Sequence, residues 1–330
     1  YKFVRWRKGQ SLTYEANPDW WGIGDPVAAR GVISFQTITY KVLAEDQVRA
    51  VGVKAGETDI AQYVTAEQCK AAASNRGTRC DSAASVETLL VRMDTMSPML
   101  GDIRVRKALV AAIDTSLIVE TILGGAATVT GQIINATALG NNPNLAPYQY
   151  DPAYAKFLLA EARADGVPVD MKIELGARQA LFAGVDEMIE AMADMWRVVG
   201  LNVSTPSIDP DGFGKVCCIE DVPEDRNLVL VHMHGNEILD FAYTYGLYYA
   251  CEGPVSVYCN PAADKVYDEA RQLSGEARDK KLQELNKILY DDVPMGYIAH
   301  MDLSYAVSDK LDWKVKLDHR LLAKDMAPVR

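Results

Sequence analysis

The chain has 330 residues, of which 49% are hydrophobic and 24% are charged, so it can bury a sizeable core and form roughly two domains or lobes. Its net charge of -11 and pI near 4.9 argue against nucleic acid as a partner, because phosphate binding needs clustered Lys and Arg side chains. Its apolar runs are short and interrupted, well below the roughly 20 residues of a membrane-spanning helix, and we expect no signal segment within residues 1–330. These properties indicate a globular chain.

The first hundred residues alternate between predicted strands and predicted helices. β-branched and apolar residues recur at every second position in several short runs, as they do in half-buried strands. One helical pattern stops at Gly56, a residue typical of helix C-termini. The predicted strands are 1–6, 12–16, 33–42, 59–63 and 87–93, and the predicted helices are 44–54 and 66–73. Together they form a first α/β block.

A run of three capped helices is predicted after that block. Asp102 and Asp114 each precede an apolar stretch with helical spacing, in positions that suit an N-cap. Asp151 and Pro152 provide the cap and the first turn of a third helix, which ends near Gly166. These helices indicate a scaffold and carry no chemistry.

A strand, a helix and a strand follow over 171–175, 185–199 and 201–205. This order predicts a right-handed crossover within a sheet. The Met and Trp residues of the helix recur at helical spacing, which indicates a side facing the core rather than a cofactor site. Helices over 262–273 and 277–290 precede a strand over 295–305 that returns the chain to the first block. A chain that passes from the first block into the second and then returns predicts two lobes joined by a hinge.

Five sequence segments are informative through both their residues and their order along the chain. They are Y-K-F-V-R-W at 1–6, E-A-N-P-D-W-W-G at 15–22, A-G-E-T-D-I at 55–60, D-I-R-V-R-K-A-L-V-A-A-I-D at 102–114 and I-L-Y-D-D-V-P at 288–294. In this order, over most of the chain, they resemble the bacterial extracellular solute-binding proteins of family 5, the dipeptide-, oligopeptide- and nickel-binding components of ABC importers. The resemblance implies an α/β, bilobal periplasmic-binding-protein-like fold of type II, in the peptide-binding cluster.

The resemblance also implies how the chain divides. Residues 1–95 with 299–330 are expected to form lobe I, and residues 96–298 are expected to form lobe II. The similar Y-K-F-V-x-W strand lies well inside family members. We therefore expect the first lobe to be incomplete here, with a preceding segment and its signal peptide outside this chain.

The segment H-G-N-E-I-L-D at 234–240 is similar to the dipeptide-binding branch, where it reads closer to W-x-G-D-x-G-D-P. The resemblance implies that Glu237 pairs with the amino terminus of a ligand, since a buried ammonium needs a charged partner. Glu in place of the usual Asp moves the carboxylate outward by one methylene, a change worth on the order of 1 to 3 kcal/mol in a pocket. His234 is expected to form one wall of the pocket or to donate a hydrogen bond to the ligand. Gly235 and Asn236 complete the predicted site, and Asp240 is expected to have a structural role first.

Other interpretations of this segment stay open. Without the resemblance it is a solvated loop after a buried strand. His232 and His234 also permit a metal site, because alternate strand residues face one side and imidazole binds zinc. No H-E-x-x-H motif or paired C-x-x-C supports that interpretation, although the family includes nickel-binding members. We also find no G-x-S-x-G, no phosphate loop and no G-x-G-x-x-G after a strand, so we expect neither catalysis nor a cofactor.

The six cysteines suit an oxidising compartment. The resemblance implies a disulfide between Cys251 and Cys259, because the matching pair in the dipeptide branch is commonly bridged. Cys69 and Cys80 are expected to bridge similarly. The adjacent pair Cys217-Cys218 cannot easily bridge without strain and is expected to be free or buried.

Together these features predict the substrate-binding protein of an ABC importer. It is expected to capture a small peptide or a related amino-bearing solute between two lobes and to deliver it to a membrane permease. We expect a monomer in the periplasm, or a membrane-anchored lipoprotein outside the cell. The alternatives are a binder of nickel, a metal chelate or another non-peptide solute, a receptor or chaperone that presents a peptide to another protein, and an unrecognised hydrolase.

Overall fold

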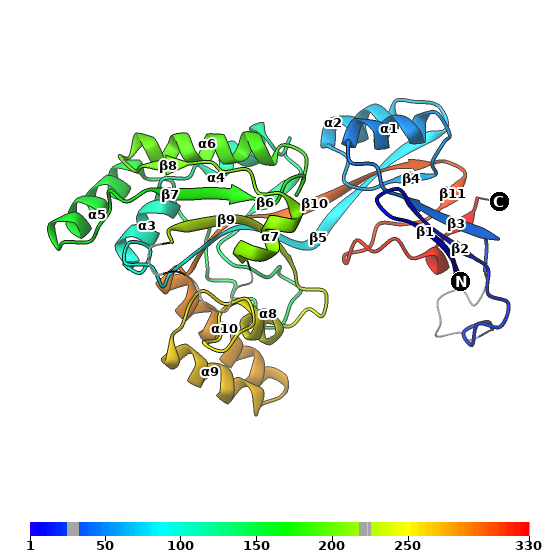
Figure 1. Cartoon of the computed structure of the whole chain (residues 1–330). Coiled ribbons are helices and arrows are strands. Elements are labelled where there is room, and N and C mark those ends of the chain that lie inside the picture. The colour runs from blue at the N-terminus through cyan, green and yellow to red at the C-terminus, as the bar shows by residue number, and fades with distance from the viewer. Residues whose placement is uncertain (25–32, 218–222, 224–225, 330) are drawn as a thin grey trace. The chain divides into compact units, whose positions relative to one another are not determined.

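The computed structural model describes residues 1–24, 33–217, 223 and 226–329 (Figure 1). Within this part the protein combines β-sheets with helices, as the sequence predicts. The chain divides into two compact units, Tyr1–Ser85 with Leu303–Arg330, and Val86–Asp302. Two long strands, β5 (Thr78–Met93) and β10 (Met295–Ser308), contain the points where the chain passes from one unit to the other. The expected lobe limits at residues 95 and 299 lie near these points.

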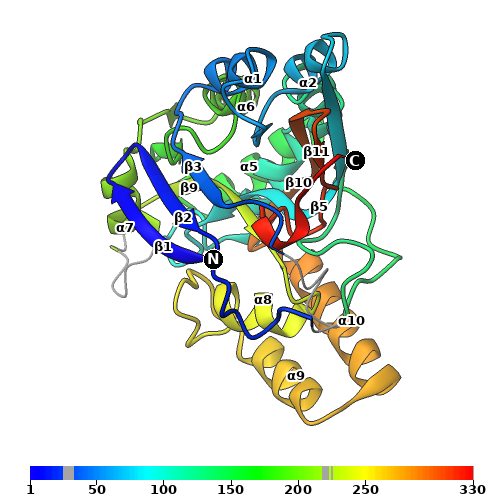
Figure 2. The same ribbon diagram turned by 90° about the vertical axis from the view of Figure 1, so that its right-hand side faces the viewer.

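The first unit begins with an antiparallel meander, the three blue strands of Figure 2. Its remaining elements are two helices, four short segments and the outer parts of β5 and β10. A capping box starts the second helix, because Thr65 and Gln68 each accept a hydrogen bond from the other's backbone N–H. The elements are β1 (Lys2–Arg7), β2 (Ser11–Glu15), β3 (Thr37–Lys41), α1 (Asp46–Lys54), β4 (Ile60–Ala61), α2 (Ala66–Ala73), β11 (Leu311–Asp312), the 3-10 turn η1 (Ala323–Asp325) and β12 (Ala327–Pro328).

The sheet of the second unit has the strand order β10-β5-β9-β7-β8, and β6 (Ala127–Val129) pairs with β10. β9 (Leu228–Gly235) lies antiparallel to β5 and parallel to β7 (Ile173–Ala177). β7 is in turn parallel to β8 (Val203–Ser204), as expected for a crossover connection. The register between β5 and β9 places Thr88 opposite His234.

The helices of the second unit begin where the sequence provides caps. The side chain of Asp102 accepts a hydrogen bond from Arg104 N at 2.8 Å, that of Asp114 from Leu117 N at 2.9 Å, and that of Asp151 from Tyr154 N at 2.8 Å, which confirms all three predicted N-caps. The helices are α3 (Ile103–Ala111), α4 (Thr115–Thr121), α5 (Pro152–Ala164), α6 (Val185–Val198), α7 (Pro210–Cys217), α8 (Phe241–Tyr248), α9 (Pro261–Arg271) and α10 (Gly275–Asp292).

The Met and Trp side of α6 lies in the core, as predicted. Met188, Met192 and Trp196 are fully buried in the largest apolar cluster of the unit. The indole N–H of Trp196 donates to the carbonyl of Leu109 at 2.9 Å, so its polar atom is satisfied inside the core. Figure 1 shows α6 running beside β7 and β8. This side of the helix therefore serves packing alone.

Some predicted boundaries differ from the structure. β5 begins at Thr78 rather than at residue 87, because its outer part continues along β10 in the first unit. The predicted strands 59–63 and 201–205 are reduced to the two-residue strands β4 and β8. The predicted strand 33–42 is confirmed over Thr37–Lys41. The helices α7 and α8 were not predicted.

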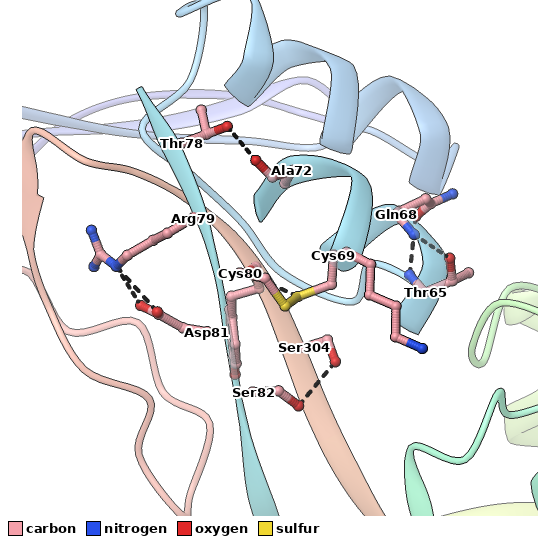
Figure 3. The surroundings of a disulfide bond; sticks show 12 residues. Thr65, Gln68, Cys69, Ala72, Thr78, Arg79, Cys80, Asp81, Ser82 and Ser304 are labelled. Carbon is pink, nitrogen blue, oxygen red and sulfur yellow. Dashed lines mark hydrogen bonds and ion pairs between the residues drawn. A yellow bond between two sulfur atoms is a disulfide. The ribbon is translucent and has the colours of Figure 1, made fainter. Parts of the chain in front are cut away.

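Both predicted disulfides are present. Cys69 and Cys80 join α2 to the outer end of β5, as Figure 3 shows, and Cys251 and Cys259 close the loop between α8 and α9. Cys217, which was expected to be free or buried, is buried and also disulfide-bonded. Cys218 lies outside the described residues.

Candidate functional site

The segment 234–240 connects β9, an inner strand of the sheet, to the start of α8. Leu239 adopts a left-handed backbone conformation with φ of 55°, which is uncommon for a residue other than Gly. Two backbone hydrogen bonds with Leu139 hold the loop in this conformation. Leu139 N donates to Leu239 O, and Phe241 N donates to Leu139 O, each at 2.9 Å. The loop is therefore fixed in shape by the neighbouring chain.

Asn236 organises the loop from inside. It is 1% exposed, and its amide group donates to Asp240 O at 2.9 Å and accepts from Asp240 N at 3.0 Å. The same amide donates to the hydroxyl of Thr244 at 2.7 Å. Because all of its polar atoms are used within the protein, we assign Asn236 a positioning role rather than a direct ligand contact.

His234 offers one ring nitrogen for a further hydrogen bond. The side chain is 5% exposed, and its Nε2 lies 2.8 Å from the hydroxyl of Thr244. That hydroxyl also accepts a hydrogen bond from the side-chain amide of Asn236, and it can donate its own proton to Nε2 when the imidazole proton is on Nδ1. Burial, reinforced by the nearby His232, lowers the pKa of His234 to about 3, so the ring is neutral at pH 7. No described residue is hydrogen-bonded to Nδ1, so this nitrogen is available for a further hydrogen bond.

His232 lies on the same side of β9 but has other neighbours. Its Nε2 lies 3.0 Å from the hydroxyl of Tyr248, and its ring stacks on Phe213. Burial, with the charges of Arg92 and Arg178, lowers the pKa of His232 to about 4. The two histidines therefore bind hydroxyl groups rather than a common centre. Within the described ranges, no three His, Cys, Asp or Glu side chains are grouped as metal ligands would be.

Glu237 lies at the exposed tip of the loop, and a second carboxylate approaches it. A Cβ atom added to Gly235 would lie 3.2 Å from Glu237 Oε1 and 2.8 Å from Glu87 Oε1. The two oxygens are therefore no farther apart than the sum of these distances, 6.0 Å. Glu87 is half-buried on β5, directly opposite Gly235 in the ladder. The missing Cβ of Gly235 thus leaves room for two carboxylates side by side.

Asp240 is engaged in structure, in keeping with the role expected for it. Its carboxylate accepts the N-cap hydrogen bond from Ala242 N at 2.9 Å and pairs with Arg278 on α10 at 2.6 Å. These bonds fix the start of α8 directly after the loop. Asp240 therefore stabilises the end of the loop that carries the candidate site residues.

Arg178 and Glu87 are candidate residues that sequence reasoning missed. Arg178 is exposed directly after β7, where an isolated bridge to Ile208 holds its backbone, and its charge acts on His232. Neither residue belongs to a recognisable motif. Their nearness to segment 234–240 comes from strand pairing between residues far apart in the chain, which no local pattern reports.

A buried ion network secures the strands beneath the loop. Asp94, at the end of β5, accepts two hydrogen bonds from Arg226, at 2.5 and 2.9 Å. Arg92 is 3% exposed and donates to the carbonyls of Cys217 and Val255. Burial lowers the pKa of Arg92 and raises that of Asp94, and the opposite charges nearby act against both shifts. The network joins β5 to α7 and fixes the frame of the site.

The buried histidines predict that stability depends on pH. Burial lowers the pKa of His232 and of His300 to about 4, and that of His234 to about 3, all below the ordinary 6.5. The unfolded chain therefore binds protons below pH 6.5 that the folded chain does not, and stability that is complete above pH 6.5 is lost as the pH falls. At about 1.36 kcal/mol per pH unit, His234 alone accounts for roughly 2 kcal/mol between pH 6.5 and pH 5.

Urea unfolding at pH 7 and pH 5 measures this effect. The difference in unfolding free energy between the two pH values should shrink by roughly 2 kcal/mol in His234→Gln, which removes the titrating ring. His319→Gln provides a comparison at a histidine outside this group. An equal pH dependence in His234→Gln and the parent protein would show that His234 is protonated in the fold.

The sequence and the fold agree with one known family. Residues 1–226 match the model of the bacterial extracellular solute-binding proteins, family 5 Middle, so the chain belongs to this family. Members of the family are periplasmic or extracellular binding proteins. Among the helices of the described residues, none combines the length and apolar character that crossing a bilayer requires.

Individual relatives are distant in sequence and close in fold. Protein XP55 of Streptomyces lividans is 25% identical over 94% of this chain and 57% of its own length. The oligopeptide-binding protein AppA of Bacillus subtilis, solved with a nonapeptide, superposes with a TM-score of 0.84 at 18% identity, over 100% of this chain and 66% of its own. NikA of Staphylococcus aureus, solved with Ni(L-His)2, has a TM-score of 0.83 at 17% identity, over 100% of this chain and 68% of its own. The chain thus spans a little over half the length of the curated relative.

Proposed function

We propose that this chain acts within a substrate-binding protein of an ABC importer, which captures a small peptide or a related amino-bearing solute and delivers it to a membrane permease. Membership of the family supports this proposal, as do the relatives named for oligopeptide binding. The observation that carries it is the exposed carboxylate of Glu237 on a loop that buried hydrogen bonds hold in a fixed shape. A rigid anionic group facing solvent is suited to capture an ammonium group.

The neighbouring groups suit the rest of a peptide. The Nδ1–H of His234 can donate to a ligand carbonyl, and the ring stays neutral, so it does not repel the ammonium beside it. Arg178 provides a cation at the end of β7 that can meet a ligand carboxylate. We therefore assign Glu237 to the amino end of the solute, His234 to its first carbonyl, and Arg178 to its acidic end.

The proposal extends to location and partners. We place the protein in the periplasm, or outside the cell as an anchored lipoprotein, where its disulfides are stable. We assign it a membrane ABC permease as its partner, a monomeric state and no catalytic activity, in line with the binding proteins of the family.

Mass spectrometry of small molecules that co-purify with the full-length protein tests this function. We expect an unmodified solute with at least one primary amine, released when the protein is denatured. A solute without any cationic group would contradict the role of Glu237. A cleaved product that accumulates with time would instead support the hydrolase alternative.

A metal chelate is the second candidate. The NikA relative was solved with Ni(L-His)2, a ligand that contains its own histidines. A preformed chelate does not require the protein to supply three metal ligands, so the spacing of His232 and His234 does not argue against it. Elemental analysis of the purified full-length protein distinguishes the candidates, because a chelate binder retains nickel in stoichiometric amount and a peptide binder does not.

A further inference from the structure

A histidine on β10 has one ring nitrogen that its neighbours fix as a hydrogen-bond acceptor. The hydroxyl of Thr88 donates its single proton to the carbonyl of Ile133 at 2.7 Å, because a carbonyl oxygen can only accept. The same hydroxyl lies 2.9 Å from Nδ1 of His300, so this nitrogen donates to it. Burial lowers the pKa of His300 to about 4, which keeps the ring neutral at pH 7. Nε2 therefore has a lone pair and no proton, and no described residue is hydrogen-bonded to it.

A carboxylate lies on the same face of the strand. Asp302 follows His300 by two residues, and both are half-buried, whereas Met301 between them is buried, so the two side chains share one face of β10. No described group is hydrogen-bonded to or ion-paired with the carboxylate of Asp302, and burial alone raises its pKa. Side chains two residues apart on a strand are separated by about 6.7 Å. This face therefore presents two unused hydrogen-bond acceptors, one of which is charged.

The two acceptors lie on the same side of the sheet as His234. Thr88 is opposite His234 in the ladder between β5 and β9, so their side chains lie on one side, where Thr88 also contacts His300 on β10. The strands of His234 and His300 are two strand spacings apart, which is about 10 Å. Thr128 is opposite His300 in the ladder with β6 and is exposed, so solvent reaches this side of β10. A solute held at Glu237 and His234 can therefore reach the two acceptors with a long side chain.

We propose that His300 and Asp302 are further ligand-binding residues, which together take a guanidinium group of the solute, as a peptide that contains arginine supplies. This inference rests on the proposed function, since it concerns the same solute. A guanidinium group has five N–H donors and no acceptor, so it can donate to Nε2 of His300 and to the carboxylate of Asp302. It also balances the partly desolvated charge of Asp302, and it is more weakly hydrated than an ammonium group, so it loses less on entering a half-buried place.

The neutral ring of His300 is essential to this assignment. A charged imidazolium has a proton on both nitrogens and repels a cation, whereas a neutral ring with its proton on Nδ1 accepts a hydrogen bond at Nε2. The hydrogen bonds from His300 to Thr88 and from Thr88 to Ile133 hold the proton on Nδ1 and fix the orientation of the ring. The acceptor is therefore in place before a solute arrives.

Isothermal titration calorimetry on the full-length protein tests the inference with alanyl-arginine and alanyl-citrulline. The two dipeptides have side chains of nearly the same shape, but the ureido group of citrulline has no charge. We expect the parent protein to bind alanyl-arginine about tenfold more tightly. Asp302→Asn should reduce this ratio to about one, with little change in the affinity for alanyl-citrulline. Asp186→Asn, at an exposed position on α6, should leave both affinities unchanged.

Equal binding of the two dipeptides by the parent protein contradicts the inference, and so does an equal loss for both in Asp302→Asn, which would show a merely structural role. If neither dipeptide binds, the proposed peptide function fails, and titration with ethylguanidinium then decides about this site alone. Nitrogen NMR follows Nε2 of His300, whose resonance is identified by its loss in His300→Gln. A shift of this resonance that Asp302→Asn weakens supports the inference, and an unchanged resonance contradicts it.

Discussion

Glu237→Gln is expected to weaken the binding of an amino-terminated solute by about 100-fold, equivalent to about 2.7 kcal/mol. The amide retains the size of the side chain but provides no charge to balance the ammonium of the solute. Because Glu237 is exposed on a loop held by Asn236 and Asp240, we expect the fold to be unaffected. Calorimetry with the solute identified by mass spectrometry measures the change directly.

Two controls distinguish the effect of the Glu237 charge on binding from the effect of its side-chain shape. Glu237→Asp keeps the charge and shortens the side chain by one methylene, so it should bind with an affinity much closer to that of the parent protein. An N-acetylated form of the solute lacks the cation, and it should bind the parent protein and Glu237→Gln equally weakly. If Glu237→Gln retains full affinity for the free amine, the carboxylate does not contact the solute.

Arg106→Met is expected to destabilise the protein by about 3 to 5 kcal/mol, because it removes one partner of a buried, charged hydrogen-bond network. Arg106 is 4% exposed on α3 and donates to the backbone carbonyls of Leu100 and Gly101. It also donates to the carbonyls of Asp292 and Val293, at the end of α10. Burial lowers its pKa in spite of the nearby carboxylate of Asp292, which shows how far it is removed from water.

Urea unfolding at neutral pH measures this loss, and Arg104→Met provides the matched control. Arg104 lies two residues earlier on the same helix and is only half-buried, with ion pairs to Asp102 and Asp165 that water screens. We expect only a small change for it. Similar losses for the two variants would show that the carbonyls around Arg106 find other partners, such as water.

The frame of the second unit was predictable because its signals are local. An Asp before an apolar stretch caps a helix whatever the rest of the chain does, and Asp102, Asp114 and Asp151 all do so. The buried side of α6 was equally clear, since Met188, Met192 and Trp196 recur at helical spacing. Such signals need only a few neighbouring residues.

The elements around the site lack signals of this kind. α8 is apolar on nearly all sides, with Phe241 and Tyr245 fully buried, so no period marks it as a helix. The outer part of β5 is polar and gains its conformation by pairing with β10. In both places contacts with distant parts of the chain outweigh local preference.

The candidate site also depends on contacts between distant parts of the chain, which local sequence patterns do not predict. Glu237 could be proposed because a motif surrounds it, whereas Glu87 stands 150 positions earlier in the chain with no motif. Only the register between β5 and β9, which sets Glu87 opposite Gly235, brings the two carboxylates together. A shift of that register by one residue would turn Glu87 to the other face of the sheet.

The bridge between Cys69 and Cys80 makes the turn from α2 to β5 a covalent ring. Arg76 lies exposed in that turn, next to Gly77 with its left-handed backbone, where trypsin has access to the chain. A cut after Arg76 breaks the backbone but leaves the two fragments joined through the sulfur atoms. On a gel the nicked protein would run as one band until a reducing agent releases its two pieces, so that one lane with dithiothreitol and one without would report both the cut and the bridge.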